Sequence, residues 1–400
     1  VSDDTDFSDG SMNDKTFTLT VNVYADGKVV TDNLDTTNTL DSITVSDCIL
    51  DPVFNSATTE YGCTVKNNVT SVTVNATATS SKSKVRGLGA KDLIEGKNTL
   101  PIRVIAEDGS EKIYNINITR KAGASSLKNE IMKNSVITAN PTLTTSSNNT
   151  SDASGLYKST ATNTGEATYY FRGNVENNYV SFAGFTWRIV RINEDGTIRI
   201  VMQDGINNNA SYQFNSNYNN YRYMYYTNSQ VKTTLESWYQ TNIGSKKDLA
   251  KNVTSGNYYC EQAKAKYDDS WKSGSATMTT YSKYTPDFKC ELDGNGKGVV
   301  NANVGLLTYD EVVYAGGYLN EMNNNYYLNN SDFPSWTMSP TGFAPGNSNS
   351  YVWAVGYSAF ISVATVDNSV PLRAVLNLTA DTLATGSGTS SDPFVIEPII

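Results

Sequence analysis

The 400-residue chain contains no histidine, and this absence excludes several kinds of site. Histidine is the usual general base near neutral pH and a frequent metal ligand. A Ser-His-Asp or Cys-His catalytic system is therefore impossible, as is a zinc or iron site with histidine ligands. Paired carboxylates, a Ser-Lys pair and calcium bound by oxygen ligands remain. Because no pair of acidic residues stands out, we expect a protein that is not an enzyme.

Charged residues are scarce as well, at 18% of the chain, and the net charge is −9. Binding to nucleic acid or to an anionic membrane depends on clustered Lys and Arg, so we expect neither as a partner. The chain has no apolar run of membrane-spanning length and no signal-peptide pattern. Since it begins at Val1 without an initiator Met, we expect a processed, exported product.

Cysteine is limited to four residues, which fall into two close pairs in sequence. Neither pair has the CxxC spacing of zinc and redox sites. Four cysteines permit three pairings, and pairing within each of two domains is the natural choice. We therefore expect the disulfides Cys48–Cys63 and Cys260–Cys290 in an extracellular protein, with free buried thiols as the alternative.

Uncharged polar residues, chiefly Thr, Ser, Asn and Tyr, take the place of the missing charges. Together with β-branched and aromatic residues they suit strands that have one wet face. A chain of 400 residues is also too long for one ordinary domain. We predict a mainly β protein of two or three domains with long loops.

Residues 1–39 are predicted to form an acidic tail followed by a β-hairpin. An apolar strand face is formed there by alternate residues, namely Phe17, Leu19, Val21 and Val23. Because an exposed strand can pair with a neighbouring subunit, these four residues are candidates for assembly.

Residues 40–121 carry a regular β rhythm, with turn signals such as Asp51-Pro52 and Glu107-Asp108-Gly109-Ser110 between short strands. This spacing is typical of a β-sandwich. The strand candidates are Ile43–Val45, Tyr61–Val65, Val69–Ala78, Thr99–Ala106 and Lys112–Arg120.

Three stretches of this region are LDSITVSDCILDPVFNSATTEYGCTV, VTSVTVNATATSSKSKV and GKNTLPIRVIAEDGSEKIYNINITR. Together they resemble a bacterial cadherin-like β-sandwich repeat, most clearly in the AEDGS turn that joins two alternating strands. The resemblance implies an immunoglobulin-like stalk or spacer of a surface protein, without catalytic residues. Cys48 and Cys63 lie where neighbouring strands of such a sandwich sit, which agrees with a local disulfide.

Residues 122–165 are predicted to hold a short helix and a Thr/Ser/Asn-rich linker. Leu127 and Ile131 share one face of the helix. The stretch NPTLTTSSNNTSDASG that follows has the composition of a flexible or glycan-bearing linker.

Residues 166–400 are predicted to form an α+β domain with two helices between its strands. The first helix is expected at Ser229–Gln240, where four residues share one face at helical spacing: Val231, Leu235, Trp238 and Tyr239. Thr308 and Glu311 form a capping-box pattern that begins the second helix. We therefore interpret Asp310 and Glu311 as residues of a helix terminus and not as catalysts.

Four segments of this domain stand out: YVSFAGFTWRIVRI, VGLLTYDEVVYAGG, WTMSPTG with SYVWAVG, and VPLRAVLNL. They resemble an uncharacterised domain of secreted bacterial proteins related to the formylglycine-generating-enzyme/C-type-lectin-like superfamily. The resemblance implies a compact α+β fold whose long loops bind ligands. The catalytic branch needs paired cysteines near its C-terminus, and this chain has none after Cys290, so the binding branch is the better analogy.

A tyrosine-rich stretch at residues 212–226 is the main candidate for ligand binding. Planar phenols stack on sugar rings or partner side chains, and Asn amides supply paired donors and acceptors. The candidate residues are Tyr218, Tyr221, Arg222, Tyr223, Tyr225 and Tyr226. The alternative is a strand with one core face, because Tyr221, Tyr223 and Tyr225 alternate.

A second candidate imitates the start of a calcium loop, with Asp293 and Asn295 as ligands. The twelfth position is Val304, where a bidentate Glu is required. We therefore predict a Gly-rich turn here, with calcium as the alternative.

Together these features predict an extracellular protein of the bacterial cell surface. The first hypothesis is an adhesin or ligand-binding head on a β-sandwich spacer, whose partner is a glycan or a host or bacterial surface protein. The second is a structural subunit of a filament or layer, assembled with copies of itself through N-terminal strand exchange. A third hypothesis, a carboxylate-based hydrolase, lacks an identifiable pair of acidic residues.

Overall fold

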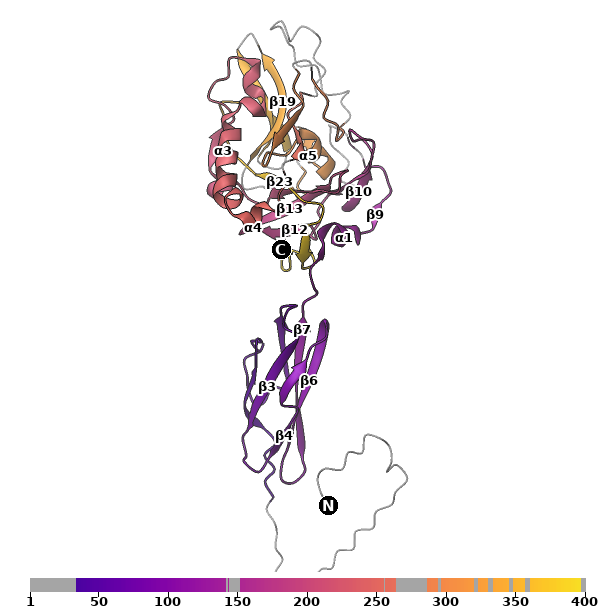
Figure 1. Cartoon of the computed structure of the whole chain (residues 1–400), viewed down its shortest axis with the longest axis vertical. Coiled ribbons are helices and arrows are strands. Elements are labelled where there is room, and N and C mark those ends of the chain that lie inside the picture. The colour runs from indigo at the N-terminus through magenta and orange to yellow at the C-terminus, as the bar shows by residue number, and fades with distance from the viewer. Residues whose placement is uncertain are drawn as a thin grey trace, which may run out of the picture. The chain divides into compact units, whose positions relative to one another are not determined.

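A computed structural model of the chain describes residues 34–141, 143, 152–254, 256–263, 286–293, 296–319, 323–329, 334–344, 348–356 and 360–396. The fold is mainly β, as predicted, and divides into two compact units that meet in sequence near Arg120. Figure 1 labels several elements of each unit. The predicted assembly strand, Phe17, Leu19, Val21 and Val23, lies outside the described residues.

The first unit is a β-sandwich of two sheets, in agreement with the prediction. One sheet contains, in spatial order, β1 (Leu40–Val45), β3 (Ser71–Ala78) and β5 (Gly89–Asp92). The other contains β2 (Glu60–Val65), β7 (Glu111–Arg120), β6 (Gly96–Ile105) and β4 (Lys84–Arg86). Side chains of β3 and β7 alternate between core and solvent, so that each sheet buries one face against the other.

A disulfide between Cys48 and Cys63 ties the loop after β1 to β2, which confirms the predicted pairing. Nearby, Asp51 and Gly62 exchange two backbone hydrogen bonds of 2.9 and 2.7 Å. Closing a loop of 15 residues stabilises a domain by about 3 kcal/mol, chiefly by restricting the unfolded chain. The disulfide thus fixes a long loop that has little regular structure of its own.

The second unit is built on a mixed sheet to which ten of the described strands belong. Eight of them run in the order β8 (Ser125–Ser126), β24 (Leu383–Thr385), β25 (Phe394–Ile396), β12 (Tyr179–Phe182), β13 (Phe185–Ile192), β11 (Thr168–Arg172), β10 (Gly155–Ser159) and β9 (Val136–Ile137). The other two, β14 (Ile198–Met202) and β23 (Val375–Leu378), pair with each other, and β14 also pairs with β13.

Smaller sheets complete this unit. One contains β18 (Tyr318–Leu319), β21 (Phe360–Thr365), β20 (Asn349–Val355) and β19 (Ser335–Ala344). Two pairs are formed by β15 (Ser211–Gln213) with β22 (Ser369–Pro371), and by β16 (Gly256–Cys260) with β17 (Val299–Ala302).

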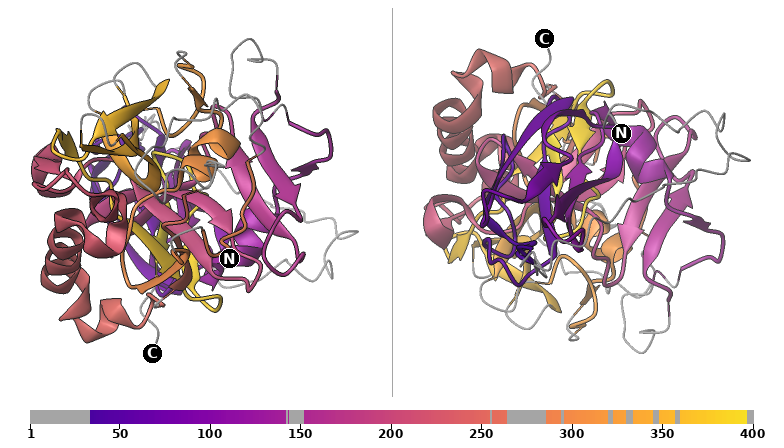
Figure 2. Two further views of the ribbon diagram at one scale, coloured as in Figure 1. Left: turned by 90° about the horizontal axis from the view of Figure 1, so that it is seen from above. Right: turned by 90° about the horizontal axis from the view of Figure 1, so that it is seen from below.

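The helices of the second unit are short. They are α1 (Leu127–Met132), α2 (Ile206–Asn209), α3 (Gln230–Tyr239), α4 (Lys247–Ala250) and α5 (Tyr309–Ala315), with the 3-10 turns η1 (Tyr221–Met224) and η2 (Tyr226–Asn228) and the π-helical turn η3 (Gln240–Gly244). Helices α3 and α4 lie on one flank of the unit, outside its strands (Figures 1 and 2). None of the described helices is long and apolar enough to span a membrane.

Residues 122–165 differ from the prediction of a helix and a linker. The helix is present as α1, capped by the Ser126 side chain, and buries Leu127 and Ile131 as expected. However, β8, β9 and β10 of the same stretch are strands of the large sheet, where Leu156 and Tyr157 are buried. Each of these strands has too few apolar residues to give a visible alternation. Most of the predicted Thr/Ser/Asn-rich linker, residues 140–155, lies outside the described residues.

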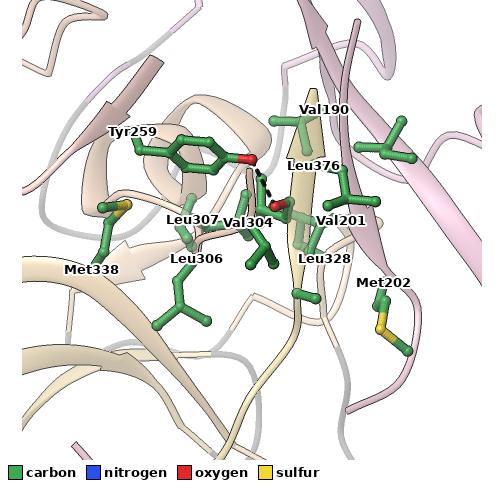
Figure 3. Close-up of a cluster of buried hydrophobic side chains, with 14 of the residues drawn as sticks. Val190, Val201, Met202, Tyr259, Val304, Leu306, Leu307, Leu328, Met338 and Leu376 are labelled. Carbon is green, nitrogen blue, oxygen red and sulfur yellow. Dashed lines mark hydrogen bonds between the residues drawn. The ribbon is translucent and has the colours of Figure 1, made fainter. Parts of the chain in front are cut away.

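The core of the second unit brings together residues that are far apart in sequence. Val190 and Val201 from the large sheet meet Leu306 and Met338, and Figure 3 shows them around the Tyr259 ring. The Tyr259 hydroxyl donates a 2.9 Å hydrogen bond to the carbonyl of Val375, which satisfies its one polar group inside an apolar environment.

Candidate binding surface

The tyrosine-rich stretch forms two 3-10 turns, η1 and η2, and not the strand that the alternation allowed. The side chain of Asn220 accepts a 3.0 Å hydrogen bond from the backbone of Arg222 and so starts the first turn. Asn228 donates from its amide to the Arg222 carbonyl at 3.1 Å. Asn side chains commonly make such local bonds, and here they outweigh the alternating pattern of the tyrosines.

The turns divide the candidate tyrosines into two groups. Tyr225 and Tyr226 are 0% exposed. The Tyr225 hydroxyl donates to Asp293 Oδ2 and the Tyr226 hydroxyl donates to the Val304 carbonyl, each at 2.9 Å. The predicted contact with a ligand is therefore wrong for these two residues, because both rings are enclosed by the core and their hydroxyls already have partners.

The other four candidates reach the solvent together. Tyr218 is 42% exposed, Tyr221 and Tyr223 are half-buried, and Arg222 is exposed. The guanidinium carbon of Arg222 lies 5.8 Å from the centroid of the Tyr221 ring. A hydrogen bond with Tyr221 raises the pKa of Arg222, so the Arg222 side chain stays positively charged. We call these four residues the tyrosine surface.

Strand β20 supports the backbone of the tyrosine surface. Ser350 is fully buried. Its backbone N–H donates to the Tyr218 carbonyl at 2.9 Å, and its hydroxyl donates to the Asn220 carbonyl at 2.6 Å. Residues 216–220 are nevertheless all exposed. The segment is thus fixed along its backbone while its side chains stay available to a partner.

The segment that begins at Asp293 was predicted as a Gly-rich turn, with calcium as the alternative. Backbone hydrogen bonds join Asp293 to Gly296 and to Lys297, at 2.9 and 2.7 Å. The Asp293 carboxylate accepts hydrogen bonds from the Tyr225 hydroxyl, from the Ala263 N–H at 3.1 Å and from the Lys297 N–H at 2.9 Å. Asn295 lies outside the described residues. Among the residues that the structure describes, no group of three or more acidic or cysteine side chains is placed to hold a metal ion.

Glu311, at the start of α5, is the centre of a buried ion cluster. Its carboxylate lies 2.5 Å from Arg199 Nε and 3.3 Å from Arg191 Nε, and it accepts a 2.9 Å hydrogen bond from the Thr308 N–H. Thr308 and Glu311 complete the predicted capping box. Burial by itself raises the pKa of Glu311, but the two guanidinium groups and the Thr308 bond outweigh it and lower the pKa.

Sequence reasoning did not single out Arg191 and Arg199. Both lie inside apolar strands, in the patterns RIVRI and TIRI, and both are buried although they are charged. An arginine in the middle of a buried strand requires buried acceptors, and a carboxylate is one of them, so these arginines were the signal available in the sequence. The partner itself is more than 100 residues away in the chain, so only the fold identifies it.

A small polar depression lies beside the second disulfide, Cys260–Cys290, which the structure contains as predicted. Arg191, Asp310 and Ser339 are among the residues that line it. Its volume is about 20 Å³, enough for one water molecule. A sugar or peptide does not fit there, so the exposed tyrosine surface remains the better candidate for ligand binding.

A match to a known protein family lies in the first unit. No curated protein matches the chain. Residues 40–121, which hold strands β1 to β7, match the family model described as a cadherin-like beta sandwich domain, as the resemblance in the sequence predicted.

Proposed function

We propose that the protein is an extracellular, non-enzymatic binding protein of a bacterial surface, which binds glycans through the tyrosine surface. The observation that carries this proposal is the composition of residues 216–223, where three tyrosines, an arginine and several asparagines share one exposed segment. In this proposal the cadherin-like sandwich is a spacer between the binding unit and the cell.

The chemistry of the segment fits sugars. The faces of Tyr218, Tyr221 and Tyr223 are suited to stack on the C–H faces of sugar rings, and the neighbouring amides pair with hydroxyls as donors and acceptors. Arg222 adds a planar fork that binds carboxylates through two parallel hydrogen bonds. Because Ser350 already holds the backbone, little conformational freedom is lost on binding.

The roles of Glu311 and Asp293 support binding over catalysis. Glu311 is engaged by Arg191 and Arg199, and Asp293 by Tyr225 and two backbone N–H groups. A general acid or base must be able to exchange its proton with a substrate. Carboxylates that are committed to the fold in this way are poor candidates for that task.

Two further considerations point the same way. The two disulfides are typical of extracellular proteins. We also infer, on the resemblance of its four sequence segments, that the second unit is an α+β domain similar to the C-type-lectin-like superfamily. Loops are the usual binding elements of such a scaffold, because they present side chains while the sheets hold them in place.

A glycan array probed with the intact chain tests the proposal. We expect binding to a defined set of glycans, and we expect Arg222→Gln to weaken binding to carboxylate-bearing glycans by about tenfold or more, because a charge-assisted bond is lost. Arg86→Gln is the matched control, since it makes the same charge change at an exposed position of the sandwich. An array without signal contradicts glycan binding, and cross-linking of a protein to residues 216–223 would identify the alternative ligand.

A further inference from the structure

The inner end of the tyrosine surface is held by two carboxylates, the buried Glu261 and the half-buried Asp293. Tyr225 follows Tyr223 by two residues and donates its hydroxyl to Asp293 at 2.9 Å. Thr227 donates to Glu261 twice, from its backbone N–H at 2.7 Å and from its hydroxyl at 2.9 Å. These bonds hold the backbone directly after η1 in place. We infer that they thereby orient the exposed rings of η1.

Lys297 completes this arrangement. Its ammonium group lies 3.7 Å from the Glu261 carboxylate, 3.3 Å from the Thr227 hydroxyl and 5.7 Å from the centroid of the Tyr225 ring. Burial raises the pKa of Glu261, while the Thr227 bonds and the Lys297 charge act in the opposite direction. We call Glu261, Asp293 and Lys297 the carboxylate clamp.

The two carboxylates of the clamp belong to segments that the second disulfide crosslinks. Glu261 directly follows Cys260, and Asp293 is three residues after Cys290. The Cα atoms of the two cysteines are 5.8 Å apart. Besides the crosslink, the described contacts between the segments include the bond from the Ala263 N–H to Asp293 and a 3.0 Å bond from the Glu291 N–H to the Gln262 side chain. Strands β16 and β17 pair next to the clamp, and the Glu261 N–H donates to the Gly298 carbonyl at 3.0 Å. The disulfide adds a covalent crosslink to these hydrogen bonds.

We propose that the Cys260–Cys290 disulfide and the carboxylate clamp set the conformation of the tyrosine surface, so that reducing this disulfide loosens the surface. A dithiol supplies the two electrons and two protons that turn the S–S bond into two thiols, and the dithiol closes into its own disulfide. Both cysteines line the small depression, and Cys290 is half-buried whereas Cys260 is buried, so Cys290 is the more exposed of the two residues. Only the consequence for ligand binding rests on the proposed function.

Hydrogen exchange of the intact chain tests this inference without any ligand. In a Cys48→Ser/Cys63→Ser variant, dithiothreitol reduces only the second disulfide. We expect reduction to speed exchange of the amides in residues 222–229 by about tenfold or more. Local opening of this segment then no longer requires movement of two crosslinked strands. Glu261→Gln, with both disulfides intact, is expected to speed exchange of the same amides, since Thr227 loses a charged acceptor.

Two controls make the result decisive. The Cys48→Ser/Cys63→Ser variant without reductant should exchange like the wild type over residues 222–229, and amides of β13 should be unaffected by the reductant. Unchanged exchange over residues 222–229 after complete reduction overturns the clamp, whatever the glycan binding. Faster exchange with an unaltered glycan affinity supports the clamp and contradicts the placement of the ligand on the tyrosine surface.

Discussion

Replacing Glu311 by Ala is expected to lower the free energy of unfolding of the second unit by about 3–5 kcal/mol, because it leaves the buried Arg199 guanidinium without its carboxylate and Arg191 with Glu194 at 3.8 Å. Arg199 and Arg191 lie 2.5 and 3.3 Å from that carboxylate and are almost fully buried. Denaturation followed by tryptophan fluorescence reports on this unit, since all five tryptophans follow residue 120 in the sequence.

A matched control separates this effect from the loss of an ordinary ion pair. Glu236 pairs with Lys232 at 2.7 Å on the exposed side of α3, where its side chain is 46% exposed. Glu236→Ala should cost less than about 1 kcal/mol, because water screens such a pair. If Glu311→Ala costs no more than Glu236→Ala, the buried cluster does not stabilise the fold.

The pH dependence of stability gives a second measure of the same cluster. The folded-state pKa of Glu311 is lowered, so its contribution is complete above its ordinary pKa of about 4.3 and is lost as the pH falls through the lower folded-state value. The wild type should therefore lose more stability on acidification below this range than Glu311→Ala does. Equal losses in the two proteins would show that the fold does not lower the pKa of Glu311.

Replacing both Tyr221 and Tyr223 by Ala is expected to weaken binding of an array-selected glycan by about 100-fold or more, as each ring central to an interface contributes about 2 kcal/mol. Both rings are half-buried, so they present a face without being free to move far. Isothermal titration of the intact chain with that glycan measures the effect. If the double variant binds the glycan with wild-type affinity, the tyrosine surface is not the binding site.

The conservative pair Tyr221→Phe and Tyr223→Phe serves as the control for this experiment. It keeps the stacking faces and removes only the hydroxyls, so we expect a loss of less than about tenfold. Both rings pack against the core, so their removal could disturb the fold. The unfolding temperature of the Ala variant is therefore compared with that of the wild type. These two checks separate a lost contact from a disturbed fold.

Helix termini and sandwich strands were predictable because their signals are local. Ser229 caps α3 and Thr308 caps α5, and in each case the residues that define the pattern lie within four positions of each other. Strands β4 and β5 gave no such signal, since their alternation buries no residue fully and leaves only half-buried and exposed positions. Short partly exposed strands are defined by their neighbours and not by their own residues.

The tyrosine stretch and the buried ion cluster show where local patterns fail. Alternation at Tyr221, Tyr223 and Tyr225 allowed a strand, yet Asn220 and Asn228 form turns that bury Tyr225 and expose Arg222. Tyr225 and Thr227 bond to Asp293 and Glu261, which come much later in the chain. Such long-range partners cannot be read from residue spacing.

Hydrogen exchange with and without the array-selected glycan tests the central claim most directly, because it locates the ligand on the intact chain. Protection is predicted to concentrate at residues 216–223, with the sandwich amides unaffected. Protection elsewhere, with unchanged exchange over residues 216–223, would contradict the claim that the tyrosine surface is where this protein binds its ligand.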